Sequence, residues 1–431
     1  MTLAIVNGHL IDPAAGLSEK CDLLLGDDGR ILEMSAGLTG DETIDATGCV
    51  VCPGLVDIHV HFREPGFETK ETIQTGSRAA ARGGVTTVVT MGNTNPPIDH
   101  AGMVEFVRRR ARETGCIRVR PAACATKGMK GEELTEMGEF RDVGAVAITD
   151  DGRDIPNSWV MRRVLEYAHM VGLPVLSHCE DPWLAGGGAM NEGYNSTKLG
   201  IGGIPKATEE IAIYRNIRLA EITGAHLHIQ HVTTAGGVDL VRQAKQQGLP
   251  VTCETCPHYF TLTDEAVLTF DTNAKMNPPL REATDVTAII EGIKDGTIDC
   301  IATDHAPHTP TEKAVEFTQA PFGIVGLETL LGLVVSQLVA PGHITLERAV
   351  DLMSHAPAKL LNLDDSEENA GVGTLREGGA GDVCVFDPKA TWAVNPNEFA
   401  SLGRNTPFTG MELTGQVRYT VCGGKIVYRG A

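Results

Sequence analysis

The sequence predicts an α/β fold: a (β/α)8 TIM barrel with a small β-sandwich domain formed by both chain ends. In the middle of the chain, short apolar segments alternate eight times with helical stretches, which is typical of a parallel barrel. Both ends contain short strands separated by turns instead. We therefore expect the N-terminal part of the small domain at 1–52, the barrel at 53–362 and the C-terminal part of the small domain at 363–431.

The terminal segments carry turn signals between apolar runs. "LAIVNGHLID" contains an Asn-Gly pair, and "CDLLLGDDGRILEM" places Asp-Asp-Gly between two apolar stretches, as a β-hairpin does. Near the other end, "GDVCVFDP", "TWAVNP" and "GQVRYTVCGGKIVYRG" have the same character. Two β-rich ends around a different middle predict one small domain built from both termini.

Eight apolar segments are the candidate barrel strands. They are residues 56–61, 86–91, 117–124, 145–151, 174–179, 225–232, 250–256 and 299–305. Intervening segments such as "SWVMRRVLEYAHMVG" have helical composition. A doubly wound open sheet is the alternative, but it would place a Gly-rich phosphate loop after the first strand. This chain has "HVHFREPG" there, which favours the barrel.

Composition narrows the class of protein. A chain of 431 residues that is 42% hydrophobic can bury a large core. Its net charge of −20 disfavours nucleic acid as a partner, and no apolar run is long enough to cross a membrane. The N-terminus resembles no secretory signal, and the eleven scattered cysteines are typical of a cytoplasmic protein. Cys253 and Cys256 form an isolated C-x-x-C pair, which we interpret as structural.

The first barrel strand ends in two histidines. Residues i and i+2 of a strand share a face, so His59 and His61 point the same way, at the strand end where TIM barrels place their active sites. If Ile58 and Val60 pack beneath the helices, both imidazoles point into the barrel. A single buried histidine would more often be a core residue, but two on one face indicate a metal site.

Other strands end in the same kinds of side chain. These are Asp150 and Asp151, His178, His231, and Asp304 with His305. Imidazole and carboxylate groups are zinc ligands, and a carboxylate can bridge two ions. Five strand ends that converge on one rim predict a metal centre. His226 and His228 have the opposite parity to His231, so we expect them to face the helix layer.

The arrangement of His-x-His on strand one, single histidines on strands five and six, and Asp on strand eight resembles the amidohydrolase superfamily. Further motifs resemble dihydroorotases of the class I bacterial type along essentially the whole chain: "ATKGMKGEEL", "ITDDG", "SHCED", "ETCPHYFTLTD", "AKMNPPLR", "IATDHAPHT" and "FGIVGLETLL". One departure is Gly92 in "MGNTNPP", where the family usually has Pro. We expect it to loosen the loop that holds Asn93.

The resemblance implies two Zn²⁺ ions per subunit. The more buried ion would be held by His59, His61 and Asp304, and the second by His178 and His231, with Asp151 as the bridge. Many relatives bridge their ions with a carboxylated lysine on strand four, but "GAVAITDDG" contains no lysine. This disfavours a dihydropyrimidinase, hydantoinase or allantoinase. A bridging aspartate would hold the second ion more weakly, so we expect that site to be partly occupied.

The family interconverts N-carbamoyl-L-aspartate and L-dihydroorotate, with loss or gain of water, in the third step of UMP biosynthesis. The resemblance implies that Asp304 is the general base. Arg63 would hold the carboxylate that does not react, in a bidentate pair. Asn93 and Asn277 would donate amide hydrogens to the same group.

The remaining implied substrate contacts are His61, His308 and the backbone of Phe322 and Gly323. The polar segment 309–320 is expected to be a mobile loop that closes over the site. The ring of His305, next to the ligand Asp304, is expected to point away.

The family also implies a cytoplasmic homodimer, which can associate with aspartate carbamoyltransferase. Two alternatives stay open. One is a related cyclic amidohydrolase with another substrate. The other is a non-catalytic homologue that scaffolds aspartate carbamoyltransferase. Such scaffolds lose zinc ligands, whereas this chain keeps them all.

Overall fold

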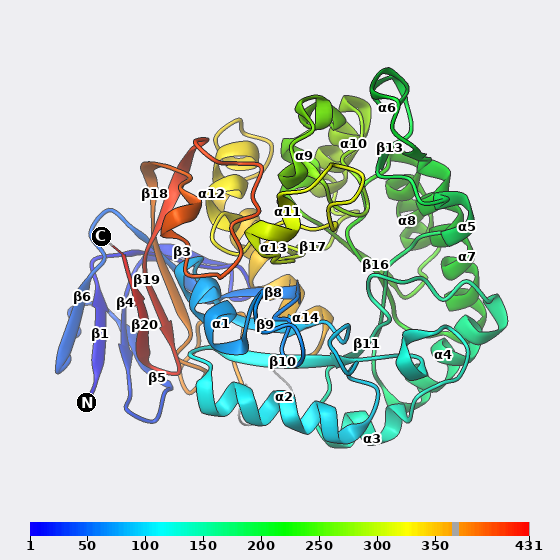
Figure 1. Cartoon of the computed structure of the whole chain (residues 1–431). Helices are drawn as coiled ribbons and strands as arrows, with labels where there is room; N and C mark the ends of the chain where they lie inside the picture. Colours follow the sequence, from blue (N-terminus) through cyan, green and yellow to red (C-terminus); the bar gives the residue numbers. More distant parts are fainter. Residues whose placement is uncertain (364–369, 431) are drawn as a thin grey trace.

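The computed structural model describes residues 1–363 and 370–430, and its centre is a parallel barrel (Figure 1). All eight predicted strands are present: β8 (Leu55–Val60), β9 (Val85–Thr90), β10 (Arg118–Ala123), β11 (Ala147–Ile148), β12 (Val175–Ser177), β15 (Leu227–Ile229), β16 (Val251–Thr255) and β17 (Cys300–Ile301). They pair in this order in one eight-stranded sheet. A parallel bridge between Val60 and His305 joins the first strand to the end of the last, which confirms the barrel.

Helices surround the barrel. The longer ones are α1 (Ile73–Arg82), α2 (Ala101–Thr114), α4 (Ser158–Val171), α7 (Lys206–Thr223), α8 (Ala235–Gln246), α10 (Ala283–Lys294) and α13 (Leu346–Met353). The shorter ones are α3 (Met137–Asp142), α5 (Pro182–Ala185), α6 (Tyr194–Leu199), α9 (Pro257–Thr261), α11 (Pro310–Lys313), α12 (Leu330–Val334) and α14 (His355–Leu360). Within the described residues, no helix has both the length and the apolar character needed to cross a membrane.

Helix α4 shows how the sequence sets these elements. Its buried residues recur every three or four positions, so one apolar side faces the barrel: Val160, Met161, Val164, Leu165, Ala168 and Val171. The Asn157 side chain accepts hydrogen bonds from the backbone N–H groups of the first turn. At the other end, Gly172 adopts a left-handed conformation (φ 73°) that ends the helix.

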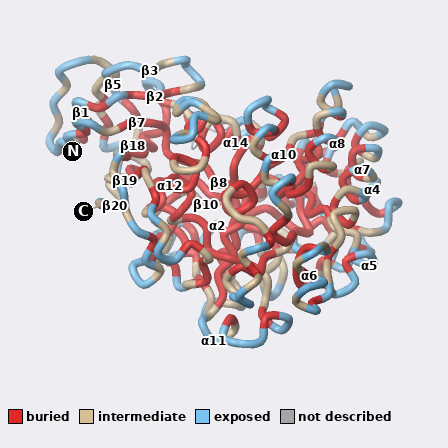
Figure 2. The backbone as a smooth tube through the Cα atoms, turned by 90° about the horizontal axis from the view of Figure 1, so that it is seen from above, coloured by how far each residue is buried: buried red, intermediate tan, exposed pale blue. Residues whose placement is uncertain are grey.

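The barrel interior holds an apolar cluster of its own. Val56, Ile58, Val89 and Leu176 belong to this cluster, and Ala358 of α14 closes it at one end. Val60 instead packs with the helix layer. A register shift between Asp57 and Val60 breaks the alternation of β8, so the expectation that Ile58 lies beneath the helices is wrong. Figure 2 shows that the strands around β8 and β10 are largely buried.

Two further sheets flank the barrel and contain both chain ends, which lie on the same side of the molecule in Figure 1. One has the order β5-β4-β1-β6, with β1 (Leu3–Val6), β4 (Asp22–Leu25), β5 (Ile31–Ser35) and β6 (Glu42–Asp45). The other has the order β20-β19-β18-β7-β2-β3, with β2 (His9–Asp12), β3 (Leu17–Lys20), β7 (Val50–Pro53), β18 (Val383–Ala393), β19 (Glu412–Cys422) and β20 (Lys425–Arg429). One apolar cluster joins the two sheets. The boundaries at 52 and 362 stay predictions; the second adjoins residues outside the described ranges.

Candidate metal centre

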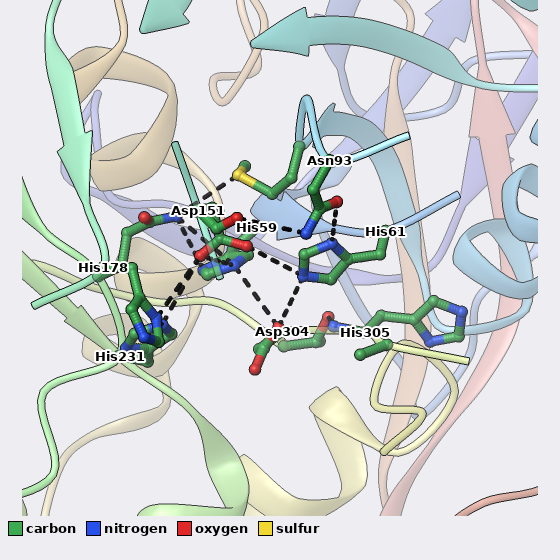
Figure 3. A network of polar contacts seen from close by, with 12 residues as sticks. His59, His61, Asn93, Asp151, His178, His231, Asp304 and His305 are labelled. Atoms are coloured by element: carbon green, nitrogen blue, oxygen red, sulfur yellow. Dashed lines mark hydrogen bonds and ion pairs between the residues drawn. The ribbon is translucent and has the colours of Figure 1, made fainter. Parts of the chain in front are cut away.

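The ends of five barrel strands bring four imidazoles and two carboxylates together (Figure 3). The residues are those predicted from the strand ends: His59, His61, Asp151, His178, His231 and Asp304. All six side chains are buried. Asp150, also named as a strand end, is turned toward the backbone N–H groups of Ala125 and Thr126.

Asp151 lies between two groups of histidines. Its Oδ1 is 3.3 Å from His59 Nε2, and its Oδ2 is 3.4 Å from His61 Nε2. On the other side, Oδ1 is 3.8 Å from His231 Nε2 and 4.0 Å from His178 Nδ1. Each trio has its ligand atoms within 4.8 Å of one another, which is close enough to share a metal ion. One carboxylate common to both trios has the position of a bridge.

The donor set fits metal ions. Asp151 Oδ1 is buried and forms no hydrogen bond with the described residues, although buried polar atoms are normally satisfied. His178 Nδ1 and His231 Nε2 lie 2.9 Å apart and both face this oxygen. Nitrogen and oxygen donors at this density suit divalent cations such as Zn²⁺.

Asp304 completes the first group. Its Oδ1 is 3.0 Å from His61 Nε2 and 3.5 Å from His59 Nε2. Burial alone would raise the pKa of Asp304 and of Asp151, but the neighbouring imidazoles lower both well below the usual range. Burial would likewise lower the pKa of His59, but the carboxylates of Asp151, Glu254 and Asp304 raise it. The carboxylates and imidazoles of the rim therefore stabilise one another's charged forms.

Three site residues adopt left-handed backbone conformations that side chains rarely favour. Their φ angles are 61° at Arg63, 35° at His231 and 48° at Asp304. Each such residue costs on the order of 1–3 kcal/mol, and such residues concentrate at functional sites. All three follow strand ends, where the turn directs the side chain to the rim.

The expectation for His226 and His228 is wrong. His228 Nε2 lies 3.2 Å from Glu254 Oε2, and Glu254 Oε1 lies 2.6 Å from His59 Nδ1, so His228 points into the barrel. His226 Nε2 contacts Thr252 Oγ1, which also faces the His228 ring. Strand β15 ends at Ile229, and the left-handed turn at His231 breaks the parity on which the prediction relied.

A cavity of about 210 Å³ opens beside the six residues. It is lined by His61, Arg63, Asn93, Asp151, Gly152, His178, His231, Asn277, Asp304, Ala306, His308, Phe322 and Gly323. Every predicted substrate contact is therefore brought to one cavity. Arg63 donates from Nε to the Pro307 carbonyl at 3.3 Å. Among the described residues, none forms an ion pair with its guanidinium, which leaves Arg63 available to an anionic ligand.

His308 is held as a neutral hydrogen-bond donor. Burial and the nearby charges of Arg63 and Lys70 lower its pKa to about 3. Its Nε2 donates to the Phe322 carbonyl at 2.8 Å. The Gly323 N–H donates to the Lys275 carbonyl, so the backbone groups expected to face a substrate already have protein partners. Their role toward a substrate stays a prediction.

The two asparagines have partners within the site. Asn93 Oδ1 accepts from His61 Nδ1 at 3.0 Å, and its Nδ2 points to the Asp151 carbonyl at 3.4 Å. Asn277 Nδ2 donates to Glu180 Oε2, and its buried Oδ1 has no hydrogen bond with the described residues. Donation of either amide to a substrate stays a prediction.

Two acids near the ligands are absent from the sequence prediction. Glu180 Oε2 lies 3.5 Å from His178 Nε2, and Glu254 contacts His59. Glu180 follows His178 in "SHCED", and a carboxylate two residues beyond a ligand is a usable signal. Glu254 lies within "CETC", whose cysteines obscure it. Both of these cysteines are buried, and neither belongs to an ion-holding group among the described residues.

The segment 309–320 is held against neighbouring loops by defined contacts. It contains α11, and Lys313 Nζ donates to the carbonyls of Thr272, Lys275 and Pro321. Lys275 Nζ donates back to the carbonyls of Phe317 and Thr318. Movement of this loop stays a prediction. The His305 ring points away from the cluster, as expected, and lies 3.4 Å from Glu71.

Steric crowding explains why a glycine fits at position 92. A Cβ atom at this position would lie 2.8 Å from the buried Cys124 Sγ, in the residue that follows β10. The sulfur therefore occupies space that a larger residue would need. Asn93 keeps its contact with His61 across this turn, so the structure gives no sign of a displaced side chain.

The chain is similar to known proteins along its length. A family model described as dihydro-orotase-like matches residues 48–236, and one described as amidohydrolase family matches residues 223–428. A dihydroorotase from Pelobacter propionicus is 51% identical over 100% of this chain and 100% of the relative. A dihydroorotase from Pelotomaculum thermopropionicum is also 51% identical, over 99% of this chain and 98% of the relative.

Among solved structures, an L-hydantoinase (dihydropyrimidinase) from Arthrobacter aurescens has a TM-score of 0.88 at 27% identity, covering 99% of this chain and 96% of that one. A D-hydantoinase from Bacillus sp. AR9 has a TM-score of 0.84 at 26% identity, covering 99% and 95%.

Proposed function

The chain belongs to the dihydroorotase family of the amidohydrolase superfamily, and on that premise we propose that it catalyses the reversible, zinc-dependent cyclisation of N-carbamoyl-L-aspartate to L-dihydroorotate with loss of water. The proposal includes its place as the third step of UMP biosynthesis. The enzyme is a hydrolase that acts on cyclic amides.

The observation that carries the proposal is the position of Arg63. Its guanidinium lines the same cavity as the six candidate ligands and has no ion-pair partner among the described residues. A dihydroorotate molecule has one carboxylate outside its ring and one amide bond to be broken. Arg63 would bind the carboxylate in a charge-assisted pair, which places the amide carbonyl over the cluster.

We propose two Zn²⁺ ions. His59, His61 and Asp304 would hold one, His178 and His231 the other, and Asp151 would bridge them. Bound zinc lowers the pKa of a water ligand to about 7 and polarises a carbonyl oxygen.

Asp304 would carry the proton. In hydrolysis it takes a proton from the attacking water as the C–O bond forms, and returns it to the ring nitrogen as the C–N bond breaks. In cyclisation the carbamoyl nitrogen attacks the side-chain carboxyl carbon. Asp304 takes the nitrogen's proton and gives it to the departing oxygen, and a second proton from solvent lets this oxygen leave as water. Arg63 holds the other carboxylate in place in both directions.

Hydantoinase or dihydropyrimidinase activity is the alternative, because the solved structures similar to this chain carry those names. Hydantoin and dihydropyrimidine rings carry no carboxylate outside the ring, so they would leave Arg63 without an anionic partner. Strand β11 and the residues around it, "GAVAITDDG", also provide no lysine. A non-catalytic scaffold is disfavoured because all six candidate ligands converge.

Substrate comparison tests the proposal directly. We expect dihydroorotate to exceed dihydrouracil in kcat/KM by about 10²-fold or more, because a buried charge pair contributes on the order of 2–5 kcal/mol. In Arg63→Met this preference should disappear, through loss of activity on dihydroorotate while the low activity on dihydrouracil persists. Equal rates on both substrates in the unmodified enzyme would contradict the proposal.

We also propose that the chain forms a cytoplasmic homodimer and that it associates with aspartate carbamoyltransferase. Large apolar side chains are exposed on the neighbouring helices α4, α5 and α7: Trp159, Trp183 and Tyr214 are 62%, 75% and 56% exposed. A second copy could cover them. Sedimentation of the purified protein, alone and with the transcarbamoylase, tests both.

A further inference from the structure

A line of polar side chains runs down the barrel interior beneath His59. Glu254 of β16 contacts His59 with one oxygen and His228 with the other. His228 Nδ1 lies 2.9 Å from Thr252 Oγ1, and His226 Nε2 lies 2.9 Å from the same hydroxyl. None of these four groups lines the substrate cavity. The reaction described above leaves them without a role.

The two nitrogens of His59 face in opposite directions. Nε2 points to the rim, 3.3 Å from Asp151 and 3.5 Å from Asp304. Nδ1 points down to Glu254 at 2.6 Å, a distance typical of a strong, charge-assisted hydrogen bond. A neutral imidazole has one N–H donor and one lone pair. When Nδ1–H donates to Glu254, the lone pair is on Nε2 and faces the place where an ion would bind.

Glu254 is itself fixed by its neighbours. Strands β15 and β16 are paired in parallel with His228 beside Thr252, so the strand register holds the His228 ring against the carboxylate. The Gln230 amide lies 3.2 Å from His59 Nδ1 and is a weaker, uncharged neighbour of the same nitrogen. The carboxylate is therefore the principal anchor of the His59 ring.

The fold alone does not require this carboxylate. Glu254 is 1% exposed, and burying a carboxylate costs several kcal/mol unless its partners offset the cost. An apolar residue would suit the surrounding interior, where Ile58, Leu176 and Ala302 pack. His228, Glu254 and Cys300 also lie close enough to hold an ion, but both oxygens of Glu254 already face imidazole nitrogens.

We propose that Glu254 is a positioning residue, which fixes the tautomer and the orientation of His59 so that Nε2 is presented to the metal ion, and that His228 holds Glu254 in place. The inference rests on the proposed metal-dependent function. It assigns part of the metal affinity to a buried acid on β16, a strand that supplies none of the six candidate ligands.

The test is zinc affinity, measured on metal-free protein by competition with a chromophoric chelator. We expect Glu254→Leu to weaken the tighter zinc site by about 10–100-fold, the range found when partners of metal-bound histidines are removed. Glu254→Gln keeps an oxygen acceptor for Nδ1–H and should recover part of the loss. The kcat for dihydroorotate should fall with zinc affinity, while KM, which depends on Arg63, should stay unchanged.

Glu71→Gln is the matched control. Glu71 is also a buried acid, and it faces the buried His305 at 3.4 Å, but its side chain touches no candidate ligand. It should lower stability without changing zinc affinity. Wild-type zinc affinity in Glu254→Gln and Glu254→Leu would overturn the proposal, and so would an equal loss in Glu71→Gln. If Glu254→Leu fails to fold, Glu254→Gln decides. Failure of the unmodified protein to bind zinc would instead refute the proposed function.

Discussion

The two pairs of histidines in the candidate metal centre are anchored differently. On the β8 side, His59 Nδ1 meets the buried Glu254 at 2.6 Å and His61 Nδ1 meets Asn93 at 3.0 Å. On the other side, His178 Nε2 meets Glu180 at 3.5 Å, and the Glu180 side chain is 21% exposed. The first pair is held by shorter contacts than the contact of His178 with the partly exposed Glu180. The β8 site should therefore hold its ion more tightly.

The largest difference should come from removing one histidine on each side. His59→Ala should lower kcat by about 10³-fold or more, because several kcal/mol of transition-state stabilisation depend on the ion. His178→Ala should reduce bound zinc from about two ions to about one and leave a lower residual activity. Elemental analysis and initial rates measure both. Full activity in His178→Ala would show that a second ion is not needed.

Chelation should separate the two sites without mutation. If the β8 side is better anchored, the ions should leave in two steps, about tenfold or more apart in chelator concentration, which corresponds to about 1.4 kcal/mol. Bound zinc and activity are followed together during titration. A single step that removes both ions would contradict the difference in anchoring.

The stability of metal-free protein should fall as pH rises. Burial would lower the pKa of both His59 and His178, but nearby carboxylates raise both, and His59 more strongly. Because each folded-state pKa lies above the unfolded value of about 6.5, the stabilisation that these charged histidines contribute is complete below about pH 6.5. It is lost as the pH rises through the folded-state pKa. The carboxylates, whose pKa values are lowered, stay ionised throughout.

Denaturant unfolding of metal-free protein at pH 6 and pH 9 measures this slope. His59→Asn should flatten it more than His178→Asn does. A free energy of unfolding that increases over this range would contradict the assignment of charge.

The smallest effect concerns packing beside the β8 pair. Gly92→Ala should destabilise the protein by about 1–3 kcal/mol, because the new Cβ would lie 2.8 Å from Cys124 Sγ in a close-packed interior. Replacing Cys124 with Ala in the same chain removes the sulfur and should restore part of the loss. Thermal unfolding of the two single variants and the double variant gives the coupling; strict additivity would show that the contact is unimportant.

The sequence predicts the barrel and the ligand rim for one physical reason. Parallel strands end at a common rim, so the residue that ends each strand predicts what meets there. Asp151 and Asp304 are both found this way although they lie 153 residues apart in the chain.

The same reasoning misses what lies deeper. Glu254 is 195 residues from His59, and no local pattern links them. The parity of β15 misplaces His228, because the left-handed turn at His231 cannot be read from alternation. The break at Ile58 is missed in the same way, since a register shift leaves no mark on composition.

The barrel closes between β8 and the residues after β17, which is also where His61 and Asp304 meet. The His61 N–H donates to the His305 carbonyl at 2.9 Å, beside the pair formed by His61 and Asp304, which are 243 residues apart. During synthesis, β8 leaves the ribosome long before β17 exists. A nascent chain therefore cannot assemble the proposed site of His59, His61 and Asp304 until nearly all of the barrel has been translated, so zinc capture there would report completed closure of the barrel.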